Sequence, residues 1–138
     1  MSGYTEFART NIIELKDVEA FTKMLEAYEI DHYIRVVTQD KDAPNMVVIV
    51  FDEGLPPSFD LDSLENVTEE MTEKSYDDVF DLITEQLTDG SLCIVKGAYV
   101  EGSRDCGGFA FAFDNTGESV SINTESIYDL AEKHFVTP

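Results

Sequence analysis

Acidic residues are crowded into one part of this sequence, between residues 53 and 90. This segment holds twelve Asp and Glu residues and a single base, Lys74, whereas residues 1–52 hold ten acids and five bases and residues 91–138 hold seven and three. From residue 60 onward its carboxylates form the candidate partner-binding set: Asp60, Asp62, Glu65, Glu69, Glu70, Glu73, Asp77, Asp78, Asp81, Glu85 and Asp89. The chemistry that such a set favours is electrostatic attraction of a basic partner.

Some of these acids recur at the spacing of helical turns. On the helix expected over residues 76–87, the side opposite the apolar face carries an acid at every fourth residue: Asp77, Asp81, Glu85 and Asp89. Successive carboxylates of this stripe are expected about 6 Å apart along the helix axis, comparable to the spacing of phosphates on one DNA strand. The stripe therefore predicts attraction to a groove that holds nucleic acid.

The sequence lacks a recognisable catalytic or metal-binding signature. Asp60, Asp62 and Glu65 have spacings that Ca²⁺ or Mg²⁺ could use, but the glycine and the ligand order of an EF-hand are missing. Neither His32 nor His134 has a companion at zinc-ligand spacing. We therefore expect a protein that is not an enzyme, with no catalytic residue, no metal and no cofactor.

The two cysteines are expected to be free thiols. A hairpin turn centred on residues 102–103 would place Cys93 opposite Ala112. It would place Cys106 opposite Tyr99, which leaves the two sulfurs too far apart to bridge. Free thiols, the lack of an apolar run of membrane-spanning length and the polar N-terminus predict a cytoplasmic protein with no membrane contact.

The periodicity of the apolar residues predicts one α+β domain over residues 1–138. Strands are expected over residues 5–15, 32–38, 46–51, 92–100, 106–114 and 118–123, and helices after Asp17, over residues 66–74 and 76–87, and after Thr124. A loop over residues 53–63, with two prolines and a glycine, separates the two halves. This order, β-α-β-β-(α)-α-β-β-β-α, implies mostly antiparallel sheet of about six strands with three to four helices.

The strand expected over residues 106–114 has two different faces, and the helix expected after Thr124 has an apolar side. Alternation places Phe109, Phe111 and Phe113 on one face of their strand. The opposite face carries Gly108, Ala110 and Ala112, whose small side chains would allow a helix to approach closely. Thr124 is expected to cap a helix with these residues turned inward: Ile127, Tyr128, Leu130, Ala131 and either His134 or Phe135.

A net charge of −20 in 138 residues exceeds what solubility requires. In size, charge and its acidic helical stretch from Leu64 to Asp89, the chain resembles the small acidic DNA-mimic proteins of phages and plasmids, the anti-restriction and anti-CRISPR inhibitors. The resemblance implies a restriction enzyme or a CRISPR effector as partner, with the acidic surface in its DNA channel. It rests on no diagnostic motif, and no site residue is transferred from it.

Several other functions are compatible with the same composition. An immunity protein or antitoxin that neutralises a basic nuclease or toxin would need a similar surface. An acidic housekeeping domain would carry its charge only as a solvated face, and salt adaptation would disperse the acid evenly, which the clustering opposes. Direct nucleic-acid binding needs a basic face that this chain lacks. A homodimer is compatible with the sequence.

Overall fold

The computed structural model describes residues 4–55, 62, 64–74, 76, 78–103 and 105–135. Its elements are β1 (Tyr4–Thr10), β2 (Ile13–Glu14), α1 (Val18–Ala27), β3 (Ile34–Asp40), β4 (Ala43–Phe51), α2 (Glu69–Lys74), α3 (Val79–Gln86), β5 (Cys93–Glu101), β6 (Asp105–Phe113), β7 (Ser119–Asn123) and α4 (Ser126–Phe135). The α+β class is confirmed, with seven strands rather than about six in the part of the chain described here. Most of the expected loop over residues 53–63 lies outside the described residues.

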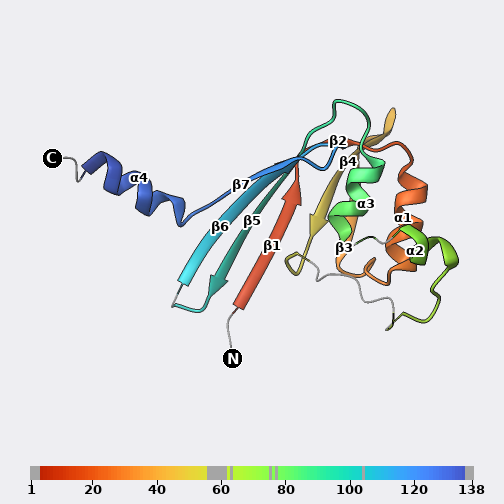
Figure 1. Ribbon diagram of the computed structural model, residues 1–138, viewed down its shortest axis with the longest axis horizontal. Helices are drawn as coiled ribbons and strands as arrows, with labels where there is room; N and C mark the ends of the chain where they lie inside the picture. Colours follow the sequence, from red (N-terminus) through yellow and green to blue (C-terminus); the bar gives the residue numbers. More distant parts are fainter. Residues whose placement is uncertain are drawn as a thin grey trace.

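The strands form one sheet in which all neighbouring named strands run antiparallel. β4 is an interior strand, in keeping with its apolar residues 46–51, because it pairs with β3 on one side and with both β1 and β2 on the other (Figure 1). From β1 the sheet continues through β5 and β6 to β7. The extra strand arises because the strand expected over residues 5–15 is interrupted at Asn11 and Ile12.

This interruption is a bulge whose polar side chains accept hydrogen bonds from backbone amides of the neighbouring strands. Along β4 the register changes by one residue, since Ala8 pairs with Phe51 whereas Ile13 pairs with Val47. The buried Thr10 hydroxyl accepts a hydrogen bond of 2.9 Å from the Ile49 amide. The Asn11 side chain accepts one of 2.7 Å from Ile94 N. The sequence pattern does not reveal these bonds, because they join segments far apart in the chain.

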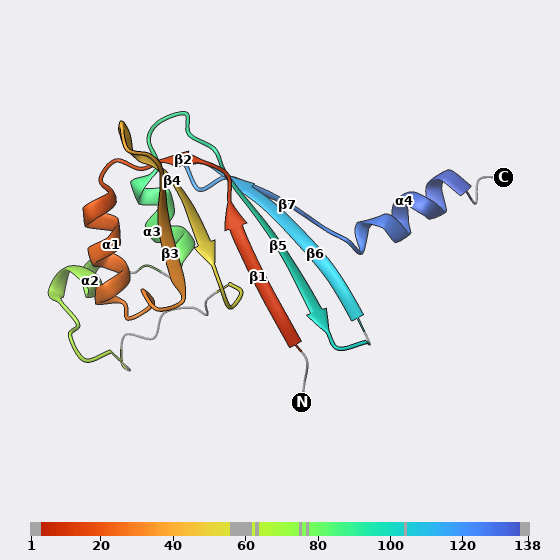
Figure 2. The ribbon, with the colours of Figure 1, turned by 180° about the vertical axis from the view of Figure 1, so that it is seen from behind.

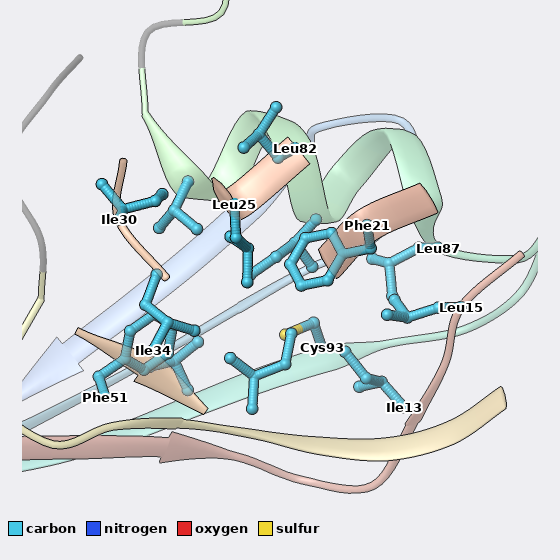
Figure 3. Close-up of a cluster of buried hydrophobic side chains, with 14 of the residues drawn as sticks. Ile13, Leu15, Phe21, Leu25, Ile30, Ile34, Phe51, Leu82, Leu87 and Cys93 are labelled. Carbon is cyan, nitrogen blue, oxygen red and sulfur yellow. The ribbon is translucent and has the colours of Figure 1, made fainter. Parts of the chain in front are cut away.

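One face of the sheet packs against helices and forms the core. The N-cap carboxylate of Asp17 accepts from Ala20 N at 3.0 Å and starts α1, as predicted. Phe21 from α1 and Leu82 from α3 are fully buried with Phe51 of β4 (Figure 3). The expected Phe109, Phe111 and Phe113 face is confirmed as part of this covered face, because their rings stack in sequence and the last two contact Phe80 of α3.

The opposite face of β1, β5, β6 and β7 is called the open face below. Cross-strand register assigns twelve side chains to it: Thr5, Phe7, Arg9, Ile94, Lys96, Ala98, Val100, Cys106, Ala110, Ala112, Val120 and Ile122. Helices α1, α2 and α3 lie together beside the β3 and β4 end of the sheet in two opposite views (Figures 1 and 2). The open face is therefore a sheet surface without a helix on it.

The predicted packing of the last helix is wrong. No residue of α4 is buried, and the helix projects beyond the sheet, away from the other helices (Figures 1 and 2). Ile127, Leu130 and Phe135 are 59%, 61% and 79% exposed. The Thr124 hydroxyl accepts from Gly108 N at 3.1 Å and so holds the end of β7 to β6. None of the helices in the described ranges combines the length and the apolarity needed to cross a membrane.

The cysteine register was predicted one residue out. Cys93 pairs with Phe113 and Cys106 with Val100, because the hairpin turn comprises the three residues between Glu101 and Asp105. Both thiols are nevertheless free, and they lie on opposite faces of the sheet.

Candidate functional site

Lys74 joins two of the predicted site residues across two helices. Its ammonium lies 3.0 Å from a Glu70 carboxylate oxygen, one helical turn earlier on α2, and 3.1 Å from one of Glu85 on α3. Hydrogen bonds to these two carboxylates raise the pKa of Lys74. The network fixes α2 beside α3 and consumes the single base of the acidic segment, so Glu70 and Glu85 present less charge to a partner than the sequence implies.

Two further predicted site residues serve the fold. Asp78 is the N-cap of α3, and its carboxylate accepts from Phe80 N at 2.9 Å and from Asp81 N at 3.3 Å. The Asp81 carboxylate accepts from Asp78 N at 3.3 Å, which completes a capping box. Both side chains are half-buried. Their positions are therefore explained by helix initiation.

The four-residue stripe predicted on this helix is wrong in its extent. α3 begins at Val79 and its cap at the other end is Leu87, so the helix is shorter than the predicted residues 76–87. Asp89 lies beyond the helix and accepts a hydrogen bond from the Asn115 side chain. Asp77 and Asp60 lie outside the described residues. The periodicity extended the helix because Asp78, its real start, resembles an ordinary exposed helical residue in sequence.

The carboxylates that remain for a partner lie on α2 and next to it. Glu65, Glu69 and Glu73 are exposed, and none has a cation within ion-pair distance among the described residues. Glu69 and Glu73 are four residues apart on α2 and form an i, i+4 acidic pair there. Of the predicted stripe, Asp81 and Glu85 remain as such a pair on α3, but Asp81 serves the capping box and Glu85 pairs with Lys74. Asp62 is also exposed.

The end of α1 adds one more acid to this region. The Glu29 carboxylate accepts a hydrogen bond of 3.2 Å from Glu65 N, which places the exposed Glu29 beside the segment that leads into α2. The acidic helical face is defined by these residues: Glu29, Glu65, Glu69, Glu70, Glu73 and Glu85. Glu29 was missed by sequence reasoning, since it lies outside the acidic segment and only the folded chain brings it there.

An apolar hollow of about 200 Å³ lies between α1 and α2, next to the acidic helical face. Met24, Tyr28, Met71 and Tyr76 form much of its wall, with Lys74 at its edge. The rings of Tyr28 and Tyr76 meet edge to face with centroids 6.2 Å apart, and burial raises the pKa of Tyr28. The hollow is smaller than the roughly 300–1,000 Å³ of typical small-molecule sites, and its size suits a single side chain of a protein partner.

The other chemically active side chains do not converge. Cys93 is buried, which raises the pKa of its thiol to about 12, and Cys106 is exposed on the opposite face. His32 packs on the neighbouring ring of Tyr33, with centroids 3.9 Å apart. Within the described ranges, no three His, Cys, Asp or Glu side chains gather closely enough to hold a metal ion. The acidic helical face with its hollow is therefore the candidate site.

Comparison with protein-family models, with curated proteins and with solved structures finds no match to this chain. The charge, exposure and geometry of its own residues are consequently the basis for a functional proposal.

Proposed function

We propose that this chain is a protein-binding inhibitor that presents its acidic helical face to the basic nucleic-acid-binding surface of another protein. The observation that carries the proposal is the group Glu65, Glu69 and Glu73, which is exposed and without a cationic partner in the described part of the chain. It lies on and just before α2, the helix whose Glu70 and Met71 line an apolar hollow. Protein interfaces usually combine an apolar core, which anchors the partner, with charged groups around it that steer association.

Folding alone does not account for these acids. Glu69 lies in the first turn of α2, where a carboxylate complements the helix dipole, but Glu73 lies in the last turn, where a negative charge opposes it. Glu69 and Glu73 also repel each other across one turn, at a cost of about 0.2–0.5 kcal/mol. A sequence selected for stability alone would place an uncharged or basic residue at position 73.

The expected partner is a protein with a cleft that normally holds DNA or RNA. Carboxylates one helical turn apart lie at a spacing comparable to that of backbone phosphates. Lys and Arg side chains that contact phosphates would contact these carboxylates in the same way, and association would be steered electrostatically and weakened by salt. A restriction enzyme, a CRISPR effector and a basic nuclease toxin share this chemistry.

The test compares three immobilised forms of the chain in a lysate of its source organism. They are the wild type, Glu65→Gln/Glu69→Gln/Glu73→Gln, and the matched control Glu14→Gln/Glu101→Gln/Glu118→Gln, which removes the same charge from exposed positions elsewhere. The wild type and the control should retain a basic nucleic-acid-binding protein that salt elutes, and the first variant at least about tenfold less of it. The identity of the retained protein separates defence enzymes from a toxin.

A competition assay completes this test. Added DNA should displace the retained protein from the wild-type chain, because both occupy the same basic surface. Equal retention by the Glu65, Glu69 and Glu73 variant, or full DNA binding by the retained protein while it is bound to the chain, would refute the proposal.

A further inference from the structure

The alternation of side chains in β7 indicates that something covers the open face. Ser119, Ser121 and Asn123 share the covered side of the sheet, whereas Val120 and Ile122 point to the open face and are 71% and 68% exposed. In an antiparallel strand with one wet face, the apolar side chains normally point to a packed layer and the polar ones to water. β7 therefore has the pattern of a strand whose apolar side packs against another layer, and this apolar side lies on the open face.

The open face has small side chains and shallow hollows that allow a helix to pack closely on it. Gly108, Ala110 and Ala112 are small, as noted from the sequence, and two shallow hollows of about 220 and 310 Å³ lie over β5, β6 and β7. Ala110 and Ile122 line both hollows. Phe7 extends the apolar surface onto β1, where it is 55% exposed. An exposed apolar surface of this continuity marks an interaction site.

Helix α4 has the matching unpartnered surface. Ile127, Leu130 and Ala131 recur at helical spacing and define one apolar side, and Asp129 and Glu132 lie outside that side. A helix of ten residues is too short to be stable in water without tertiary contacts, for which about 12–15 residues are the lower limit even in good sequences. The formation of α4 therefore depends on packing that the chain by itself does not supply.

Two cations lie side by side on the open face. Arg9 and Lys96 are direct cross-strand neighbours on this face, both are exposed, and neither forms an ion pair with any described residue. In a chain with 29 acids and nine bases, two adjacent uncompensated cations are unusual. They favour the approach of an acidic surface, and a second copy of this chain, with its net charge of −20, supplies one.

The helix that fits belongs to a second copy of the chain. Only Thr124 and Glu125 separate β7 from α4. The Thr124 amide donates to Gly108 O at 2.9 Å and its hydroxyl accepts from Gly108 N, so both bonds fix the end of β7 against β6. From this point α4 leads away from its own sheet (Figure 1). With Thr124 held in this way, only Glu125 remains to turn α4 back onto its own open face, whereas a two-fold axis brings each arm to the other sheet without such a turn.

We infer that two copies of this chain form a symmetric dimer by exchange of arms, in which α4 of each copy packs on the open face of the other. The acidic helical face lies on the other side of the sheet and stays exposed in both copies. The dimer thus presents two acidic helical faces, and its existence does not depend on the function proposed for them.

The test is sedimentation equilibrium of the full-length chain and of two single variants. Ile122→Asp damages the open face and Leu130→Asp damages the arm, at positions 68% and 61% exposed. We expect a wild-type dimer, and a dissociation constant raised at least about 100-fold in each variant, because each homodimer then contains two defective contacts. Val67→Asp, 40% exposed ahead of α2, is the charge-matched control and should leave the dimer unchanged.

An equimolar mixture of the two variants tests the exchange itself. The mixed dimer regains one intact contact, between the arm of the Ile122→Asp chain and the open face of the Leu130→Asp chain, so it should form more tightly than either homodimer. A monomeric wild type, a dimer insensitive to Ile122→Asp, or a mixture no tighter than its components would overturn the inference. Circular dichroism and thermal melting at low concentration confirm that both variants are folded.

Discussion

The two sides of the sheet differ in what they expose. The side with α1, α2 and α3 is apolar inside and acidic outside, with Glu65, Glu69 and Glu73 unpaired among the described residues. The open face is apolar at its surface and carries two uncompensated cations, Arg9 and Lys96. Each side thus bears a feature that a monomeric soluble domain does not need. The difference teaches that one sheet can separate an acidic surface from an apolar one.

The largest expected contrast is between a buried and an open position of the same sheet. Phe51→Ala removes a fully buried ring that packs against Phe80, and it should lower the free energy of unfolding by about 3–5 kcal/mol. Val120→Ala on the open face should change it by no more than about 0.5 kcal/mol when the arm carries Leu130→Asp and the chain is monomeric. Urea denaturation measures both. A loss above about 2 kcal/mol for Val120→Ala would mean that the open face is packed within one chain.

The next largest effect is expected from reversing a charge on the open face, and it is an effect on the dissociation constant of the dimer. Lys96→Glu replaces a cation of the open face with an acid, which a second copy of net charge −20 repels, so the dissociation constant of the dimer should rise about tenfold. Lys41→Glu, exposed in the turn between β3 and β4, changes the net charge equally and serves as the control. Analytical ultracentrifugation at fixed ionic strength compares the two. Equal effects of both variants would show that net charge, not the position of Lys96, governs the dimer.

A smaller difference in unfolding free energy is expected between acids that stabilise the fold and acids that are left for a partner. Asp78→Ala removes the N-cap of α3 and should cost about 1 kcal/mol of unfolding free energy, within a range of 0.5–2. Glu65→Gln removes a carboxylate that receives no hydrogen bond from a described residue, and it should cost nothing measurable. Thermal and urea denaturation of the two variants are the measurements. A larger loss for Glu65→Gln than for Asp78→Ala would reverse the assignment of these residues.

Local patterns predicted the elements well and their long-range contacts poorly. The N-cap Asp17, the phenylalanine face of β6 and the interior position of β4 follow from spacing within one segment. The bulge at Thr10 and Asn11 depends on Ile49 and Ile94, far along the chain, so no local pattern could reveal it. The spacing in α4 identified an apolar side, but the prediction that this side faces inward was wrong, because periodicity does not say which surface an apolar side contacts.

The candidate site was predicted in composition and not in geometry. Sequence counts located the acidic segment, yet they could not separate Asp78 and Asp81, which cap α3, from Glu65, Glu69 and Glu73. The difference lies in which backbone amides each carboxylate reaches. Glu29 and the tyrosines of the apolar hollow come from α1 and from the segment before α3, which only the tertiary fold brings beside α2.

The central claim is that the unpaired carboxylates of the acidic helical face do not serve the fold. Its most direct test is the free energy of unfolding of Glu65→Gln/Glu69→Gln/Glu73→Gln against the parent chain, both with Leu130→Asp to exclude dimerisation. At low ionic strength the triple variant should be more stable by about 0.2–0.5 kcal/mol, because the repulsion between Glu69 and Glu73 is removed while their opposite interactions with the helix dipole offset each other. This difference should fade as salt screens the repulsion. A triple variant less stable than its parent at low salt would show that these acids stabilise the fold and would contradict the claim.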